Sequence, residues 1–288
     1  MTVGKSWFAA FLPGLLFAAS SAAAAPSENH PRRVVSMNVC TDQLAMLLAD
    51  EGQLASVSHM ARQREFSVLW QRAGALTVNH GHAEEVYLMR PDLVLAGSYS
   101  TRVTVDLLRR LGVRVETFAP TSSLEDIRKD IQTMGRLLGQ SPRAAAIVSA
   151  FDREVAALRA SHGDRKPLAA LYYANSYTSG RGTLAAEIVG LAGLDNLASR
   201  LGLTGTARLP LESLVMHAPE IIVTGQRYGG DNAQATSVLD HPALTRGGSL
   251  PGALVIADHE WICGLPFTIE AARRLGSAAR AATDREAR

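Results

Sequence analysis

This sequence lacks most of the features that are typical of an enzyme or a nucleic-acid-binding protein. Its 29 Lys and Arg nearly balance its 27 Asp and Glu, so neither a nucleic acid nor an anionic membrane surface is indicated as a partner. The zinc-site spacings H-E-x-x-H and C-x-x-C, the nucleophile elbow G-x-S-x-G, low-complexity segments and solenoid repeats are all absent. We therefore expect no catalytic residue, no resident metal and no intrinsic cofactor.

Only one apolar run is long, and it lies at the N-terminus. Lys5 is the only charged residue among the first 25, residues 7–19 are almost wholly apolar, and residues 20–25 are small. This is the pattern of a secretory signal peptide, too short and wrongly flanked for a membrane span. We expect a signal peptide over residues 1–24, cleaved after Ala24, and a mature protein in the periplasm. Because no cysteine lies near the cut, we expect no lipid anchor.

The whole chain of 288 residues is 47% hydrophobic, which is enough for two modest cores. One pattern occurs twice within it: an acidic residue lies seven positions before a proline that opens a buried strand. Glu84 precedes PDLVLAG, which begins at Pro91, and Glu212 precedes PEIIVTG, which begins at Pro219. The duplication indicates two similar halves.

Residues 141–161 lie between the two copies and predict a helix of about 20 residues, roughly 30 Å long. Ser141 is suited to cap this helix and Pro142 to its first turn. The apolar residues of one helical stripe are Ala144, Ile147, Phe151, Val155 and Leu158.

Strands and helices alternate in both halves. In residues 32–138 we expect strands at 33–37, 54–58, 76–78, 93–96 and 113–118, and helices at 42–48, 84–89, 101–111 and from 122 or 123 to 138. In residues 165–285 we expect strands at 167–174, 221–224 and 253–257, helices at 183–191, 212–217, 237–240 and 267–282, and a turn at 193–196. This alternation predicts mostly parallel, covered α/β sheets.

Ligands of open α/β sheets bind beyond the carboxyl ends of the strands. This rule selects the loops at 38–42, 59–64, 79–82 and 97–101 in the first half, and 175–181, 226–228 and 258–263 in the second. Two such loop sets facing each other form a cleft, whose aromatic rings offer apolar faces and whose arginines bind anions. The candidate ligand-binding residues are Asn38, Cys40, Thr41, Arg62, His80, Tyr99, Tyr177, Arg181, Arg227, Tyr228 and Trp261.

Two other kinds of site need to be weighed. The loop histidines raise a bare-metal site, but the sequence His80-Gly81-His82 has no further ligand at a diagnostic spacing. Residues 180–185, GRGTLA, match the dinucleotide-binding pattern G-x-G-x-x-A, but the acidic residue expected about 20 positions later is missing. We interpret this stretch as a tight turn.

The only cysteines are Cys40 and Cys263, and both would meet an oxidising compartment after export. A bond between them would pin the two lobes if both loops line the cleft. We favour the alternative of two separate thiols, because facing lobes keep a ligand-sized gap that exceeds the ~7 Å Cα separation a disulfide spans.

Glu84 and Glu212 each open a short helix at the same distance from the following strand. The helix dipole favours an acidic residue at such a position, which would explain one of them alone. Their presence in both halves indicates a matched pair of exposed acids that a symmetric partner with basic sockets binds.

From about residue 32 to residue 275 the sequence resembles the periplasmic binding proteins that serve ABC importers of ferric siderophores, haem and vitamin B12. The resemblance lies in RVVSMNVCTDQL, EEVYLMRPDLVLAGS, the long helix, TSGRGTLAAEIVGLAGLDNLA and LESLVMHAPEIIVTG. It implies two α/β lobes with mostly parallel sheets, joined by a single long rigid helix, and a shallow cleft for a metal chelate. It also implies that Glu84 and Glu212 dock onto arginines of the permease. Residues 38–42 depart from the family's usual sequence, so that loop's contacts are not carried over.

The leading hypothesis is a monomeric periplasmic receptor that captures a ferric siderophore or a corrinoid and delivers it to an ABC permease and its ATPase. Arginines around the cleft favour an anionic ferric chelate, whereas an aromatic cleft with few charges favours cobalamin. The loops supply both, and we favour the ferric chelate. The alternative is an exported zinc- or manganese-binding protein, or a metalloenzyme, that uses the loop histidines and cysteines.

Overall fold

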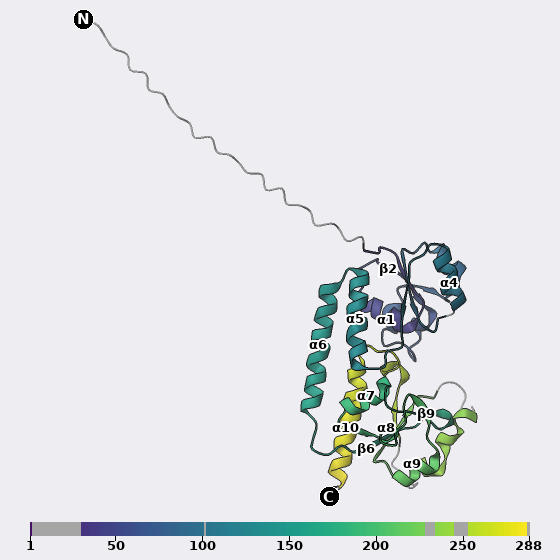
Figure 1. Cartoon of the computed structure of the whole chain (residues 1–288), viewed down its shortest axis with the longest axis vertical. Helices are drawn as coiled ribbons and strands as arrows, with labels where there is room; N and C mark the ends of the chain where they lie inside the picture. Colours follow the sequence, from purple (N-terminus) through teal and green to yellow (C-terminus); the bar gives the residue numbers. More distant parts are fainter. Residues whose placement is uncertain (2–29, 101, 228–233, 245–252, 287–288) are drawn as a thin grey trace.

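The computed structural model describes residues 1, 30–100, 102–227, 234–244 and 253–286. All of the expected signal peptide except Met1 lies outside this part of the chain, as does Tyr228. The described residues form two α/β lobes, one above the other in Figure 1, with a long helix along one side. No helix among them is long and apolar enough to span a membrane.

The N-terminal lobe is built on a five-stranded parallel sheet with the strand order β3-β2-β1-β4-β5. Its strands are β1 (Val34–Ser36), β2 (Leu54–Ser58), β3 (Thr77–Asn79), β4 (Leu93–Gly97) and β5 (Val115–Phe118). Its helices are α1 (Val39–Leu48), η1 (His59–Arg62), α2 (Trp70–Ala73), α3 (Ala83–Leu88), α4 (Arg102–Arg110) and α5 (Leu124–Leu138).

The C-terminal lobe has a four-stranded parallel sheet in the order β11-β10-β6-β8 and an antiparallel pair of β7 with β9. The strands are β6 (Leu168–Leu171), β7 (Tyr177–Ser179), β8 (Asp195–Asn196), β9 (Thr206–Arg208), β10 (Ile221–Gly225) and β11 (Leu254–Ile256). The helices are η2 (Ala174–Ser176), α7 (Leu184–Leu191), α8 (Leu197–Arg200), α9 (Leu211–His217), η3 (Gln234–Asp240), η4 (Pro242–Leu244), η5 (Asp258–Glu260) and α10 (Thr268–Glu286).

The long helix α6 (Ser141–Ala160) joins the lobes. It packs along α5 of the N-terminal lobe and contacts α7 and α10 of the C-terminal lobe. Its buried residues are Ala144, Val148, Phe151 and Val155. The expected Ser141 cap is wrong, because Ser141 already belongs to the first helical turn and Gln140 occupies the cap position without a side-chain hydrogen bond.

A single cluster of buried apolar side chains runs through both lobes. It includes Leu48 of α1, Met134 of α5, Phe151 of α6, Leu171 of β6 and Leu275 of α10. Protein interiors are packed as densely as organic crystals, so a shared core resists sliding and separation of the parts that it joins. The lobes are therefore held in one arrangement by α6 and by this continuous core.

Candidate functional site

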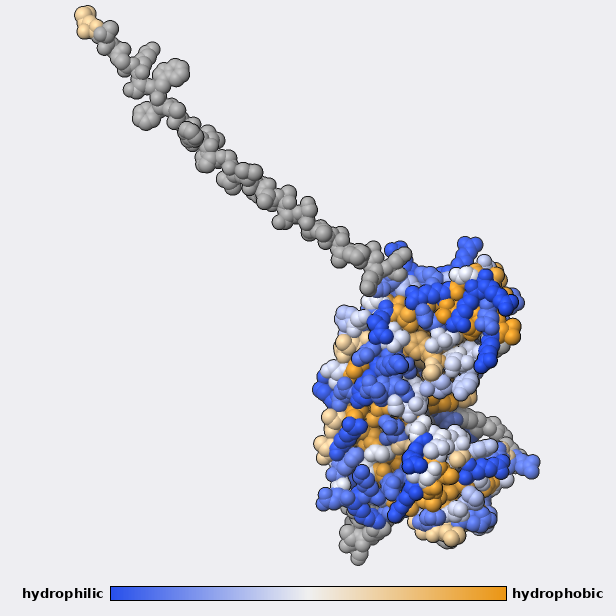
Figure 2. Space-filling view, viewed as in Figure 1, coloured by the Kyte–Doolittle hydropathy of each residue, from blue (hydrophilic) through white to orange (hydrophobic). Residues whose placement is uncertain are grey.

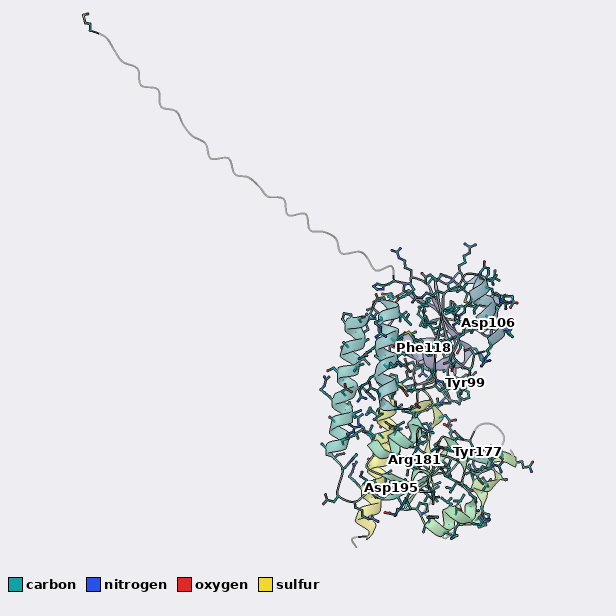
Figure 3. The ribbon with its side chains drawn as sticks, in the orientation of Figure 1. Tyr99, Asp106, Phe118, Tyr177, Arg181 and Asp195 are labelled. Atoms are coloured by element: carbon teal, nitrogen blue, oxygen red, sulfur yellow. A yellow bond between two sulfur atoms is a disulfide. The ribbon has the colours of Figure 1, made fainter. Side chains whose placement is uncertain are left out.

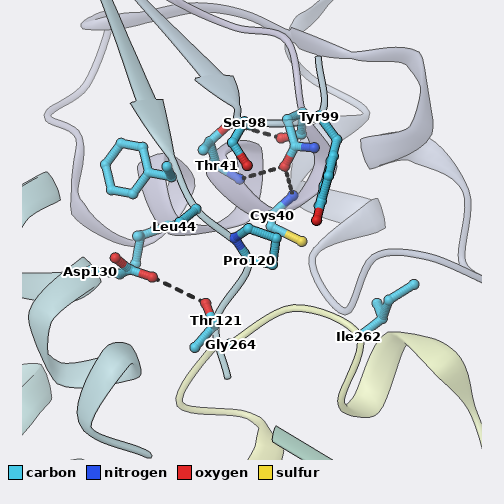
Figure 4. Close-up of a pocket in the computed structure, with 14 residues that line it drawn as sticks. Cys40, Thr41, Leu44, Ser98, Tyr99, Pro120, Thr121, Asp130, Ile262 and Gly264 are labelled. Atoms are coloured by element: carbon cyan, nitrogen blue, oxygen red, sulfur yellow. Dashed lines mark hydrogen bonds between the residues drawn. The ribbon is translucent and has the colours of Figure 1, made fainter. Parts of the chain in front are cut away.

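A pocket of about 200 Å³ lies where the two lobes meet, and it is shown in Figure 4. The surface is hollowed between the lobes in Figure 2. The lining comes from the carboxyl ends of β4 and β5 with the loops that follow them, from the start of α1 after β1, from α5 and from the segment before α10. Most of it therefore lies at the carboxyl ends of parallel strands, as expected. The lining residues are Asn38, Cys40, Thr41, Leu44, Gly97, Ser98, Tyr99, Phe118, Ala119, Pro120, Thr121, Asp130, Ile262 and Gly264.

Asn38 is held in place at the start of α1. Its side-chain oxygen accepts hydrogen bonds from the backbone N–H of Cys40 (3.0 Å) and Thr41 (3.4 Å), so it caps the helix. A Cβ on Gly97 would lie 2.9 Å from Asn38 Nδ2. The glycine at the end of β4 therefore leaves the space that the asparagine side chain occupies.

The rim of the pocket is apolar and carries little charge. Tyr99 is 89% exposed and Ile262 is 54% exposed, on opposite lobes. Asp130 is the only charged side chain in the described lining; it accepts a hydrogen bond from Thr121 Oγ1 at 3.1 Å, and burial raises its pKa. Because the described lining contains no arginine or lysine, this pocket does not supply the cation that an anionic chelate requires.

The lobes touch at the floor of the pocket, and here the expectation of separate thiols is wrong. Cys40 and Cys263 form a disulfide with a Cα separation of 5.1 Å, well inside the distance that a disulfide spans. Next to it, a Cβ on Gly264 would lie only 2.1 Å from Thr121 Cγ2 across the lobe boundary. The gap for a ligand therefore lies above this contact and not between the two cysteines.

Four predicted site residues, Asn38, Cys40, Thr41 and Tyr99, come together in this pocket. The remaining described candidates are placed elsewhere, and except for the buried Trp261 their role in binding stays a prediction. Figure 3 shows Tyr99 and Phe118 in the N-terminal lobe and Tyr177 in the C-terminal lobe.

The first-half candidates outside the pocket are committed to other contacts. Arg62 donates hydrogen bonds to the backbone oxygens of Ala73 and Gly74, at 3.3 and 3.4 Å. His80 stacks on His59, with 5.3 Å between the ring centroids, and its backbone N–H also bonds to Glu85. Both side chains therefore stabilise local loop structure.

The second-half candidates are similarly engaged. Tyr177 lies under the guanidinium of Arg208, 5.5 Å from it. Arg181 donates to the backbone oxygen of Gly202 at 3.4 Å, and Arg227 forms an ion pair with Asp240 at 2.8 Å.

Trp261 was expected to line the cleft, and the structure corrects this. The residue is only 8% exposed and belongs to the apolar core. It follows η5, whose turn directs the next residue, Ile262, to the pocket instead. Trp261 was favoured because an aromatic ring suits a ligand, but its side chain is buried in the core instead.

The pocket residues that the sequence did not predict include the segment 118–121 at the end of β5 and Asp130 on α5. The rule about carboxyl ends of strands would have selected residues 119–121, because a strand ending at Phe118 was expected. Asp130 gives no such signal, since it lies in the middle of a helix.

A buried polar cluster lies beneath the loops of the N-terminal lobe. Asp42 is fully buried and accepts a hydrogen bond from the backbone N–H of Ser58 at 3.1 Å. Burial raises its pKa to about 7, although hydrogen bonds from Ser36 and Ser58 act in the opposite direction. Asn79 Nδ2 donates to the backbone oxygen of Ser36 at 2.8 Å, which ties the ends of β1 and β3 together.

The bare-metal alternative gains no support from the described residues, which contain no group of three or more His, Cys, Asp or Glu placed to hold an ion. Cys40 and Cys263 are bonded to each other, so neither is a thiolate ligand or a nucleophile. Residues 180–183 form a turn before α7, in which Gly182 has φ +77° and Thr183 caps the helix. This agrees with the interpretation as a tight turn.

Glu84 and Glu212 occupy the same place in the two lobes. Each is the second residue of its helix, α3 or α9, and each is exposed. Figure 1 places α9 and α4, against which α3 packs, on the side of the molecule away from α6. This arrangement permits a partner to dock onto Glu84 and Glu212, and their docking role stays a prediction.

These features define a two-lobed binding protein in which one long helix joins the lobes and the candidate site lies between them. A profile of the family described as periplasmic binding protein matches residues 34–246, and the chain belongs to this family.

Among curated proteins, a cobalamin-binding protein of Halobacterium salinarum is 28% identical over 229 residues, which cover 76% of this chain and 60% of that relative. The periplasmic heme-binding protein RhuT of Roseiflexus sp. RS-1 has a TM-score of 0.72 at 20% identity, covering 87% of this chain and 98% of that one. The vitamin B12-binding protein BtuF of Vibrio cholerae has a TM-score of 0.66 at 17% identity, covering 88% and 98%. These likenesses to solved structures show the fold.

Proposed function

We propose that this protein is the periplasmic binding component of an ABC importer, not an enzyme, and that its cargo is a corrinoid such as cobalamin. Its domains are the lobes 32–138 and 165–285 on either side of helix 141–161, and it acts as a monomer. A cleavable signal peptide over residues 1–24 directs it to the periplasm. The permease and its ATPase in the inner membrane receive the cargo.

The choice of cargo rests on the charge of the pocket. Ferric catecholates are strongly anionic and haem carries two carboxylates, so both need cationic partners when they are buried. The described lining offers Asp130 and no cation. Cobalamin presents a macrocycle edge with amide groups, which suits polar side chains such as Asn38 and Thr41 beside an aromatic ring. The name of the Halobacterium relative agrees with this choice.

The pocket is smaller than the ~300–1,000 Å³ of a typical ligand site, since its volume is about 200 Å³. It therefore accepts only one edge of a macrocycle, and the rest of the ligand lies in the open space between the lobes. Tyr99, which is 89% exposed at the rim, is placed to cover an apolar face of the ligand.

The test is an equilibrium titration of the purified mature protein with cyanocobalamin, haem and a ferric catecholate, each followed by its visible absorbance after dialysis. We expect one cyanocobalamin per chain with micromolar or tighter affinity. Tyr99→Ala should weaken this binding by about 1–2 kcal/mol, or about 5–30-fold. Tyr87→Ala is the matched control, since Tyr87 is an exposed tyrosine on α3 that does not line the pocket.

The outcome of this titration distinguishes a corrinoid from the other cargoes and from a bare metal ion. Preferential binding of haem or of the ferric catecholate would contradict the cargo but keep the binding function. Stoichiometric zinc or manganese without any bound chelate would support the bare-metal alternative instead.

A further inference from the structure

Helix α3 of the N-terminal lobe presents an acid and a large apolar side chain on one exposed face. Val86 is fully buried and fixes the orientation of this short helix. Glu84 lies two residues before it, and Leu88, two residues after it, is 78% exposed. Residues four apart on a helix lie on the same face, one turn from each other. The exposed face of α3 therefore pairs a carboxylate with an unburied leucine.

Helix α9 of the C-terminal lobe repeats this arrangement position by position. Leu214 is fully buried, Glu212 lies two residues before it and is exposed, and Met216, two residues after it, is 80% exposed. The two helices also precede equivalent strands: β4 lies between β1 and β5, and β10 lies between β6 and β11. The lobes thus show the same pair of side chains at the same place in the fold.

The backbone after the two helices matches as well. Arg90 and Ala218 both have positive φ, +50° and +40°, and each directly precedes a proline. Non-glycine residues adopt this conformation at a cost and keep it only where the surrounding structure enforces it. Each of these residues follows the exposed apolar side chain by two positions, so the connections from the two helices to the next strands match at this position.

These matches distinguish Leu88 and Met216 from scattered exposed apolar residues, which are common on soluble proteins and need no explanation. Glu84 and Glu212 make no hydrogen bond or ion pair within the part of the chain that the structure describes. Free carboxylates select a basic partner, and an unburied leucine or methionine beside each of them selects an apolar recess. Because the arrangement occurs twice, the complementary partner presents a basic group and an apolar recess twice, as a two-fold symmetric assembly does.

We propose that Leu88 and Met216, called here the apolar pair, are docking side chains that enter two equivalent apolar recesses on the two membrane subunits of the permease. Each recess lies about one helical turn from the basic group that receives Glu84 or Glu212. This proposal rests on the proposed function and adds a second kind of contact to the acidic one. Burial of a leucine or methionine is worth more than an exposed ion pair, so the apolar pair sets the lifetime of the complex. The acids set its rate of formation.

The experiment measures binding of the full mature protein to the permease–ATPase complex whose deletion in the source organism abolishes uptake, reconstituted in lipid nanodiscs. Leu88→Ser with Met216→Ser should raise Kd about 100-fold, about tenfold for each site, through faster dissociation at every salt concentration. Glu84→Arg with Glu212→Arg should slow association and reverse its dependence on salt, because added salt then screens a repulsion. Leu201→Ser is the matched control, because Leu201 is an exposed leucine of the C-terminal lobe that is not part of a repeated acid–apolar pair. It should change neither the association rate nor the dissociation rate.

Ligand affinity is measured on every variant and should stay within twofold of the unsubstituted protein, which shows that each variant folds. If the unsubstituted protein binds the complex and the double serine variant binds it with the same dissociation rate, the apolar pair is refuted while the proposed function stands. If the unsubstituted protein binds its ligand but not the complex, the proposed delivery function fails together with the pair.

Discussion

The disulfide between Cys40 and Cys263 gives the sharpest prediction about stability. The bond joins α1 of the first lobe to the segment before α10 of the second, across 223 residues of sequence. Replacing both cysteines with serine removes the covalent link while leaving no unpaired thiol. Since the bond lies at the floor of the cleft, the substitution loosens the point at which the lobes meet.

The size of the effect follows from loop closure. A disulfide restricts the unfolded chain, and for a loop of 223 residues the chain-entropy relation gives about 5 kcal/mol at 25 °C. This is the upper end of the measured range. In a protein of this size 1 kcal/mol corresponds to about 2–4 °C in Tm, so the double serine variant should unfold about 10–20 °C lower.

The assay is thermal unfolding followed by circular dichroism, with the number of free thiols determined by titration under denaturing conditions. The native protein should show no free thiol and the higher Tm. The same protein reduced with dithiothreitol should show two thiols and the Tm of the double serine variant. Two free thiols in the unreduced protein would show that the bond is absent, and an equal Tm for the oxidised and reduced forms would show that it does not stabilise the fold.

Two further predictions concern the contact between the lobes and the buried acid. Gly264→Ala places a methyl group against Thr121, where a Cβ would lie 2.1 Å from Cγ2, so it should lower stability by about 1–3 kcal/mol in denaturant titration. Gly190→Ala is the control, because no atom beyond its own helix backbone lies within 4 Å of the new Cβ. An equal loss of stability in both variants would show that the clash is not the cause. The pKa of Asp42 is raised from 3.8 to about 7, so the unfolded state loses the proton of this carboxyl first as pH rises. Stability should therefore fall between about pH 4 and about pH 7, by at most about 4 kcal/mol, and then level off. Asp42→Asn should remove this part of the pH dependence, and an unchanged profile of unfolding free energy against pH would contradict it.

Periodicity and turn residues were sufficient for most of the fold. The strand at 54–58 was predicted at the bounds that the structure shows, and the helix at 141–161 differs from α6 by one residue. Both carry strong local patterns, an apolar run between turn residues and a helical stripe. Some short elements of the C-terminal lobe were missed: residues 195 and 196, expected to lie in a turn, form the edge strand β8, because pairing with β6 decides their conformation. Local sequence does not encode such pairing.

For the candidate site, the sequence identified the loops better than the side chains. Asn38, Thr41 and Tyr99 were selected and line the pocket, because the position of a loop after a strand can be read from the chain. Which side chain of a loop faces the cleft depends on the turn that the loop makes, and so Ile262 and not Trp261 lines the pocket. The disulfide depended on the distance between lobes, which no local pattern contains.

Hydrogen–deuterium exchange of the mature protein with and without saturating cyanocobalamin tests the central claim, that the cargo lies between two lobes held together at the floor of the cleft. We predict slower exchange on binding in residues 38–41, 97–99 and 118–121 of one lobe and in 262–264 of the other. The surfaces of α3 and α9 should exchange as before. Slower exchange confined to one lobe, or located away from these four segments, would contradict it.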